Sequence, residues 1–333
     1  MKLLFLGFDG LDYNDVEKFI PSFKRGVYGI SYPEKGFALT GPSWSSIYTG
    51  VKRDKHKVMH VWGLKGKESK IEDSNIDNIE SVRLVDSTYK PIWKLVDSSY
   101  KVGVVGMPLT YPAIEVNGFM IPGYPSLRNF STHPIFVRDL LLEKYYTDFV
   151  EVIMKNEESF MANNYTKKVI ELYNDGILDH FIRGLEYKRI DKVFELIDRF
   201  DTEILFIQFP FVDHISHCLN FEDNDVCRMV YDVVKDLLDK LELLNPDNVF
   251  IISDHGRPAQ DSWHTINGFY CMYKTDQEYY DNYRVDINNI DICPTILELL
   301  GLQYNESDFD GNAIETRIES EEIKARLKGL GYM

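Results

Sequence analysis

The sequence predicts an α/β fold in which a mostly parallel central sheet is flanked by helices. Short apolar, β-branched runs alternate with segments of helical periodicity, which is typical of parallel sheets covered on both faces. The clearest runs are Leu3 to Phe8, Lys101 to Gly106, Ile204 to Phe209 and Asn248 to Ser253. The chain has 333 residues, 44% of them hydrophobic, which suffices for a large core. We therefore expect residues 1–333 to form a single α/β domain.

The segments between these strands carry helix start and stop signals. Pro42 suits the first turn of a helix and Gly50 suits its end, and Asn245-Pro246 ends an amphipathic stretch. A further strand, from Phe269 to Lys274, follows the last of the central runs. The expected helices are Asn14 to Ile20, Pro42 to Gly50, a short helix ending at Leu95 to Ser99, Met229 to Leu244, Asp291 to Gly301 and Ser320 to Leu330.

Residues from about 107 to 200 differ in composition and pattern from the rest of the chain. They begin with loops that contain proline and glycine and continue as charged, amphipathic helices. Apolar residues recur there at helical spacing, a pattern more typical of packing than of a ligand cage. They include Leu140, Leu141, Tyr145, Phe149, Val193, Leu196, Ile197 and Phe200. We expect this segment to be a cap-like insertion of helices and loops over the sheet, near the functional site.

The charge of the chain excludes some classes of partner. The formal net charge is −16, from 53 acidic and 37 basic residues, whereas proteins that coat nucleic acids or anionic membranes select basic surfaces. A small phosphorylated substrate is compatible with this charge, because metal ions can meet its own charge locally. No run approaches the length of a membrane span, and Gly7 and Asp9 break the N-terminal apolar run too early for a signal peptide. Four cysteines without a paired motif favour reduced thiols and a cytoplasmic protein, whose oligomeric state the sequence does not indicate.

Acidic and imidazole side chains stand where three predicted strands end. Asp9 follows the first strand, and Asp254 with His255 follows the fourth. Asp213 and His217 follow the third, and at i and i+4 of a helical turn they share one face. Open α/β sheets bind ligands at this edge, and carboxylates with imidazoles are typical ligands of divalent ions. Each pattern alone also has a plainer explanation: a turn aspartate, a surface pair or an ordinary strand-to-loop junction.

Loops near the same edge supply a hydroxyl and a third histidine. Thr40 stands just before a helix, where free N–H groups favour negative charge, and is either a helix cap or a metal-activated alkoxide nucleophile. His264 lies beside the edge only if the strand after it is antiparallel or its loop folds back. Asp254 and His255 are adjacent on a strand and can face one ion only if the chain turns there, which Gly256 allows.

Three carboxylates, three imidazoles and one hydroxyl suit a pair of divalent ions. Carboxylate and imidazole ligands together are of borderline hardness, which favours zinc first and manganese second. Two such ions about 4 Å apart stabilise both the attacking and the leaving oxygen of an in-line displacement. The sequence therefore predicts metal-assisted phosphoryl transfer, with a non-catalytic metal-binding module as the alternative of a different class.

The ordered set of motifs resembles the alkaline phosphatase superfamily, in particular its type I phosphodiesterase/nucleotide pyrophosphatase group and the predicted phosphohydrolase/phosphomutase relatives. The resemblance covers nearly the whole chain and implies an alkaline phosphatase-like fold. Its motifs are Phe8-Asp9-Gly10, Thr40-x-Pro42 with Thr49-Gly50, Asp213-x-x-x-His217, Asp254-His255-Gly256 and His264, with flanking matches at Met107 to Pro112, Asn117-Gly118 and Cys293-Pro294-Thr295 through Asp310-Gly311.

The resemblance also implies a role for each residue. One zinc would be held by Asp213, His217 and His264, and the other by Asp9, Asp254 and His255, with Thr40 beside the second. Thr40 would attack phosphorus, form a covalent phospho-threonine and release the alcohol. Water activated by the other zinc would then hydrolyse this intermediate. The implied activity is hydrolysis of a phosphodiester or pyrophosphate bond.

Two positions depart from the family pattern. Ser43 stands where nucleotide pyrophosphatases usually have an asparagine that contacts the phosphoryl oxygen, and Lys57 follows His56 where a glycine is usual. Trp44 either lines the pocket or packs the helix. Arg257 either supplies the extra cation that a monoester dianion needs or lies on the surface. Ser43, Trp44 and Arg257 are therefore candidate substrate-binding residues with a structural alternative.

Related activities of the superfamily fit the sequence less well. Sulfatases need a cysteine or serine nucleophile followed by an arginine, and Thr40 to Trp44 has neither in place. Cofactor-independent phosphoglycerate mutases use a serine and a longer chain with a phosphate-transfer domain. Because the nucleophile motif contains no cation, a diester or pyrophosphate is favoured over the substrate of a phosphomonoesterase or phosphomutase. The residues do not identify the physiological substrate.

Overall fold

The central element of the protein is a nine-stranded sheet. The computed structural model describes residues 1–64, 79–81, 88–123, 131–138, 163–258, 264–276 and 282–314. The strand order is β10-β2-β9-β8-β1-β7-β5-β6, with β11 paired to β2, and a separate two-stranded sheet joins β3 to β4. The strands are β1 Leu3–Phe8, β2 Val27–Tyr32, β3 Trp62–Leu64, β4 Ile79–Ser81, β5 Val102–Val105, β6 Gly118–Ile121, β7 Ile204–Phe209, β8 Asn248–Ile252, β9 Gly268–Lys274, β10 Tyr283–Arg284 and β11 Ile287–Asn288.

Most of the sheet is parallel. Strand β1 lies between β7 and β8, and all three run in the same direction, as do β5 and β6. Strand β9 is antiparallel to both β8 and β2. The predicted α/β class, with a mostly parallel sheet flanked by helices, is confirmed. The central strands read as continuous apolar runs because helices cover both of their faces.

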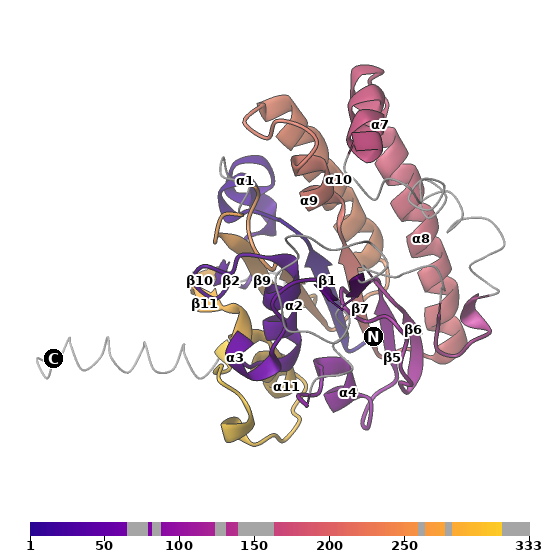
Figure 1. The fold of residues 1–333 in the computed structure, drawn as a ribbon. Helices are drawn as coiled ribbons and strands as arrows, with labels where there is room; N and C mark the ends of the chain where they lie inside the picture. Colours follow the sequence, from indigo (N-terminus) through magenta and orange to yellow (C-terminus); the bar gives the residue numbers. More distant parts are fainter. Residues whose placement is uncertain are drawn as a thin grey trace, which may run out of the picture.

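Helices cover the sheet in two layers (Figure 1). Leu4, Leu6 and Phe8 of β1 belong to the core shared with α1, α8 and α10, whereas Leu3 and Phe5 belong to the core under α2, α4 and α11. This alternation follows from the two-residue period of a strand. The α-helices are α1 Tyr13–Phe19, α2 Thr40–Thr49, α3 Arg53–His56, α4 Ile92–Val96, α7 Asn163–Asn174, α8 Leu178–Phe200, α9 Phe211–Ser216, α10 Asn224–Glu242 and α11 Ile292–Leu299.

Helix α2 is buried almost all round, although its sequence is rich in hydroxyl groups. The Ser45 hydroxyl donates to the Gly41 carbonyl at 2.8 Å, and the Thr49 hydroxyl donates to the Ser45 carbonyl at 2.6 Å. These bonds satisfy the hydroxyls inside the helix, so that small polar side chains can face packed neighbours. The helix ends at Gly50, whose φ of 68° is the left-handed conformation that favours glycine.

The predicted elements agree with the structure except at some boundaries. Strands β1 and β7 have the predicted bounds, and β8 ends one residue early. Helix α10 begins at Asn224, five residues before the predicted Met229, because the Asp223 side chain accepts from the Asp225 N–H as an N-cap. The helix predicted for Ser320 to Leu330 lies outside the described residues, as do Leu140, Leu141, Tyr145 and Phe149.

Part of the segment from 107 to 200 belongs to the main fold. Strand β6 pairs with β5 at the edge of the central sheet. Helix α8 contributes Ile190, Val193 and Leu196 to the core on that side of the sheet. Its apolar stripe is narrow and the rest of the helix is charged, which is the pattern of a helix that covers a sheet with one face. A cap role for the remainder of the segment stays a prediction.

The helices of the described ranges give no membrane span. None of them combines the length and the continuous apolar surface that crossing a bilayer requires.

Candidate metal centre and nucleophile

The predicted ligands meet at the carboxyl ends of β1, β7 and β8. Asp9 directly follows β1, and Asp254 and His255 follow β8 after one residue. Asp213 and His217 lie in and directly after α9, the short helix that leaves β7. The parallel register of the three strands brings their ends to one edge of the sheet.

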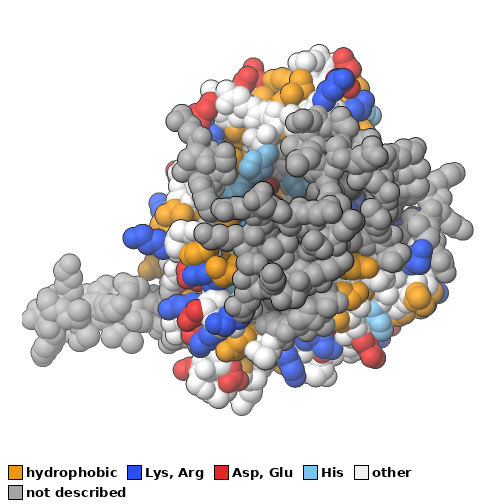
Figure 2. All heavy atoms as spheres, viewed as in Figure 1, with side chains coloured by type: hydrophobic (Ala, Val, Ile, Leu, Met, Phe, Trp, Pro, Cys, Tyr) orange, Lys and Arg blue, Asp and Glu red, His pale blue; other side chains and the backbone are white. Residues whose placement is uncertain are grey.

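We call Asp213, His217 and His264 the outer ligand set. Asp213 Oδ1 lies 3.4 Å from His217 Nε2 and 3.1 Å from His264 Nε2. The two Nε2 atoms are 3.0 Å apart. One ligand atom of each residue therefore points at a common position, as a metal site requires. The His217 side chain is 44% exposed, and Figure 2 shows histidine side chains at the surface on this face of the molecule.

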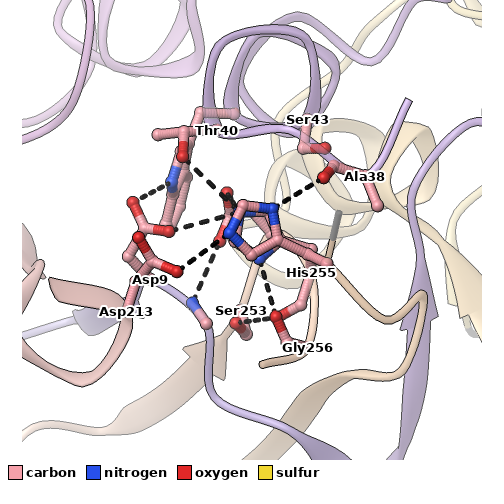
Figure 3. Close-up of polar contacts among 12 residues, drawn as sticks. Asp9, Ala38, Thr40, Ser43, Asp213, Ser253, His255 and Gly256 are labelled. Atoms are coloured by element: carbon pink, nitrogen blue, oxygen red, sulfur yellow. Dashed lines mark hydrogen bonds and ion pairs between the residues drawn. The ribbon is translucent and has the colours of Figure 1, made fainter. Parts of the chain in front are cut away.

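We call Asp9, Asp254 and His255 the inner ligand set. His255 Nε2 lies 3.1 Å from Asp254 Oδ2 and 3.4 Å from Asp9 Oδ1, and the side chains of Asp254 and His255 are fully buried. Asp213 stands between the two sets, because its carboxylate also lies within 4.8 Å of the ligand atoms of Asp9 and His255. The His255 and His264 rings stack at 3.8 Å between centroids. The two sets are thus neighbours in one cluster (Figure 3).

Backbone carbonyls fix the orientation of two imidazoles. His255 Nδ1 lies 2.9 Å from the Gly256 carbonyl, and His264 Nδ1 lies 2.9 Å from the Ala38 carbonyl. A carbonyl only accepts, so each Nδ1 carries the proton and each Nε2 presents a lone pair to the cluster. This is the tautomer that a metal-ligating histidine needs.

The cluster fits divalent cations because its acceptors face one another. Within the described part of the chain, Asp9 Oδ1, Asp213 Oδ1 and Asp254 Oδ2 are buried without a hydrogen-bond donor, and each faces an Nε2 lone pair. Burial and the charge of Asp213 raise the pKa of Asp9 to about 8. Burial lowers the pKa of His255 to about 3, so this imidazole is neutral. Carboxylates and neutral imidazoles that converge in this way are stabilised by a cation.

Thr40 is the first residue of α2, beside the inner set. Its Oγ1 lies 3.5 Å from His255 Nε2. Leu39 occupies the N-cap position, and no side chain caps this helix. The interpretation of Thr40 as a helix cap is therefore wrong, because its hydroxyl is directed at the ligand cluster and not at the free N–H groups of its own helix.

Three weaker candidates have other partners. The Ser43 hydroxyl donates to the Phe37 carbonyl at 3.2 Å. Trp44 is fully buried in the helix packing, but its Nε1 also donates to Asp9 Oδ2 at 3.4 Å. Both side chains are buried, so the contacts favour the packing interpretation of Trp44. Its bond to a predicted ligand has no signature in the sequence.

Arg257 is directed away from the ligand cluster. Its Nη1 donates to the Phe221 carbonyl at 2.7 Å and its Nη2 to Glu222 at 3.2 Å. Its Nε lies 3.7 Å from the Asp15 carboxylate. These contacts tie the loop after β8 to the loop before α10. They favour the structural interpretation of Arg257 over a role in substrate binding.

The loop with His264 folds back onto the end of β8. The Gly256 N–H donates to the Thr265 carbonyl, and the Thr265 N–H donates to the Arg257 carbonyl, both at 2.9 Å. Gly256 is required here for close approach and not for a left-handed turn, because a Cβ would lie 2.0 Å from Thr265 Oγ1 and 2.3 Å from Asp12 Oδ2. The sequence placed His264 at this edge only if its loop folds back or the following strand is antiparallel. Both are observed, since Pro258 pairs with His264 and β9 is antiparallel to β8.

Sequence reasoning missed residues that support the ligands from behind. Ser253 bridges the loops after β1 and β8, and Asn289 donates from its side chain to the Asp254 carbonyl at 2.8 Å. The Ala38 carbonyl orients His264. Ser253 directly precedes the Asp-His-Gly motif, so its place beside the ligands follows from the sequence. Ala38 and Asn289 act through tertiary contacts that no local pattern indicates.

A comparison with protein-family models shows the family to which this chain belongs. The model for type I phosphodiesterase/nucleotide pyrophosphatase matches residues 3–281. The chain belongs to this family. As a type I phosphodiesterase/nucleotide pyrophosphatase family member, it is a phosphohydrolase. Searches of curated proteins gave no match.

Solved structures share the fold of this phosphodiesterase family member at low sequence identity. Human ectonucleotide pyrophosphatase/phosphodiesterase 5 aligns with a TM-score of 0.53 at 12% identity, covering 94% of this chain and 97% of its own. A quadruple mutant of the alkaline phosphatase PafA aligns with a TM-score of 0.54 at 11% identity, covering 94% and 98%. A putative sulfatase from Bacteroides thetaiotaomicron aligns with a TM-score of 0.50 at 13% identity, covering 94% and 73%. At these identities the likeness establishes an alkaline phosphatase-like fold.

Proposed function

We propose that the protein is a two-metal phosphodiesterase or nucleotide pyrophosphatase that works through a covalent phospho-threonine at Thr40. The observation that carries the proposal is the convergence of three buried, partnerless carboxylate oxygens and two correctly protonated imidazoles beside the Thr40 hydroxyl. The outer ligand set would hold one ion and the inner ligand set the other. Zinc is the first candidate and manganese the second.

The bound ions would lower the pKa of the Thr40 hydroxyl and of a water molecule, and would offset charge on the phosphoryl oxygens. Thr40 Oγ1 attacks phosphorus, and the bond from phosphorus to the leaving oxygen breaks, so that the alcohol departs with a proton. Water then attacks the phospho-threonine, and Thr40 is released as a hydroxyl. The first N–H groups of α2 lie next to the nucleophile and add a positive dipole end there.

A monoanionic phosphate ester suits the charge of this site. The three carboxylates leave two divalent ions with a single excess positive charge, which matches one anionic diester. A dianionic monoester would need another cation, and the guanidinium of Arg257 is engaged by Phe221, Glu222 and Asp15. These contacts support a phosphodiester or pyrophosphate over a monoester.

The test compares two chromogenic substrates on protein loaded with zinc or manganese. Bis-p-nitrophenyl phosphate should be hydrolysed faster than p-nitrophenyl phosphate, and both activities should disappear on chelation. Preference for the monoester would instead assign a phosphomonoesterase or phosphomutase. Hydrolysis that survives complete metal removal would overturn the two-metal proposal.

A cytoplasmic location belongs to the same proposal. All four cysteines are free thiols, three of them buried. Free thiols in a core are typical of proteins from a reducing compartment. Fractionation of cells that produce the full-length protein tests the location, and recovery from the medium or periplasm would contradict it.

A further inference from the structure

The two halves of the inner ligand set come from separate strand ends. Strands β1 and β8 pair in parallel as far as Gly7 and Ile252. Asp9 and Asp254 both lie two residues beyond this last pair. The sheet register therefore does not fix the distance between the two carboxylates, and another contact has to hold the two loops together.

The hydroxyl of Ser253 makes that contact. Its Oγ accepts a hydrogen bond from the Leu11 N–H at 2.8 Å and donates one to the His255 carbonyl at 2.7 Å. The Ser253 backbone N–H donates to the Phe269 carbonyl on β9 at 2.8 Å, which fixes the residue from the other side. Ser253 is fully buried. Figure 3 shows Ser253 beside Gly256, below the imidazole rings of the cluster.

The other link between the two loops is weaker. The Gly10 N–H lies 3.4 Å from Asp254 Oδ1, at the long end of the range for a hydrogen bond. It also engages a predicted ligand, whereas Ser253 leaves every ligand atom free. A hydroxyl suits this position because it donates one hydrogen bond and accepts another.

We infer that Ser253 is a positioning residue, which holds Asp9 and the Asp254-His255 pair at the separation that the inner metal requires. The inference rests on the proposed two-metal function. Removal of the hydroxyl leaves a buried N–H and a buried carbonyl without partners, and the loops move apart to find new ones. The outer set is oriented by a different group, the Ala38 carbonyl. The effect of losing the hydroxyl is therefore expected chiefly at the inner metal.

The experiment measures zinc affinity separately at each set. His217→Ala removes an outer ligand and leaves the inner set complete, whereas Asp254→Asn does the reverse. Zinc binding to full-length protein is followed by calorimetry and elemental analysis. Adding Ser253→Ala to the His217→Ala protein should weaken zinc binding about 10- to 100-fold, as loss of a supporting contact does in other metal sites. Adding it to the Asp254→Asn protein should leave the affinity unchanged.

Matched variants separate positioning from general damage. Ser45→Ala removes another fully buried hydroxyl, which bonds inside its own helix, and should leave both affinities unchanged. Ser253→Thr keeps the hydroxyl and should restore inner-set binding. Where Ser253→Ala fails to fold, Ser253→Cys, a weaker donor of similar volume, takes its place with the same expected direction.

The outcomes distinguish the inference from the proposed function. Wild-type protein that binds no zinc or manganese would refute the proposed function. Two ions in the wild type, with Ser253→Ala either without effect or equally harmful at both sets, would refute the role of Ser253 alone. Selective loss at the inner set, rescued by Ser253→Thr, supports it.

Discussion

At the residue scale, single atoms decide what each ligand offers. Placing the proton of His255 and of His264 on Nδ1 leaves both Nε2 lone pairs for a cation. The Thr40 hydroxyl faces the same cluster from the first position of α2. These details support the distinct roles that we propose for neighbouring residues: imidazoles that bind metal, and a hydroxyl that reacts.

Replacing the proposed nucleophile separates chemistry from metal binding. Thr40→Ala should lower turnover of bis-p-nitrophenyl phosphate by at least about 1,000-fold, because no other hydroxyl takes the place of Oγ1. The metal content, measured by elemental analysis, should stay at two ions. Thr40→Ser keeps a hydroxyl and serves as the control with measurable activity. Full activity in Thr40→Ala would remove this residue from the mechanism.

Lys57 is a residue-scale departure from the family pattern with a cost in stability. Its φ is 63°, the left-handed conformation that favours glycine. Lys57→Gly should stabilise the protein by about 0.5 kcal/mol, since relief of this strain exceeds the entropy that glycine loses. Denaturant unfolding measures the change. Lys57→Ala keeps a Cβ and should show no gain, and an equal gain in that variant would contradict the backbone explanation.

At the element scale, contact between α2 and β1 sets the position of the nucleophile relative to Asp9. The Trp44 ring of α2 lies over Gly7 of β1. A Cβ atom added at Gly7 would lie 2.5 Å from this ring. The indole N–H of the same ring reaches Asp9. Helix α2 can therefore pack closely on β1 because Gly7 has no side chain, and the position of α2 on the sheet depends on this glycine.

Two glycine substitutions test this packing with opposite expected signs. Gly7→Ala should cost about 1–3 kcal/mol, because the added methyl displaces Trp44 and with it α2. Diester turnover should fall as Thr40 moves away from the cluster. Gly184→Ala, inside α8 with no neighbour within 4 Å, should stabilise by about 1 kcal/mol. Thermal and denaturant unfolding give both values, and loss of stability in both variants would refute the packing argument.

At the scale of the whole molecule, the ligand cluster joins segments that are far apart in the chain. Asp9, Thr40, Asp213, Asp254 and His264 come from separate elements around one sheet edge. Without a cation, burial and repulsion between carboxylates disfavour the charged forms of Asp9 and Asp254. Metal binding is therefore coupled to the stability of the fold and to the release of protons.

The stability of metal-free protein should depend on pH with a defined sign. The pKa of Asp9 is about 8 in the folded chain, against an ordinary value of 3.8, because of burial and of Asp213. Between pH 4 and 8 the folded state holds a proton that the unfolded state releases, so stability falls as pH rises, by at most about 1.4 kcal/mol per pH unit for one group. Bound metal replaces this proton.

The stabilisation by zinc should consequently be larger at pH 8 than at pH 6. The melting temperature with and without the metal, measured across this range, checks the expectation. Asp9→Asn removes the titrating carboxyl and should flatten the pH dependence of the metal-free protein. An unchanged slope in that variant would assign the effect to another group.

The sequence predicted the fold class and most elements because each strand and helix has a local pattern. Strands β1 and β7 are uniform apolar runs, and Gly50 and Asn245-Pro246 stop their helices. The start of α10 was predicted too late because its first turn is polar and depends on the Asp223 cap. The sequence did not indicate that strand β6 pairs with β5. Strand β6 is short and lies between loops, and a pairing partner leaves no local pattern in the sequence.

The sequence by itself determined the chemistry available to the protein: the carboxylates, imidazoles and hydroxyl that follow its strands, in an order that matches the family. Residue type and spacing are local properties, so they can be read along the chain. Only the tertiary structure showed that Arg257 contacts the loop before α10, and that Ser253 bridges the loops after β1 and β8. These contacts join residues that lie more than 30 or 240 positions apart. They depend on how whole elements pack, which no local pattern encodes.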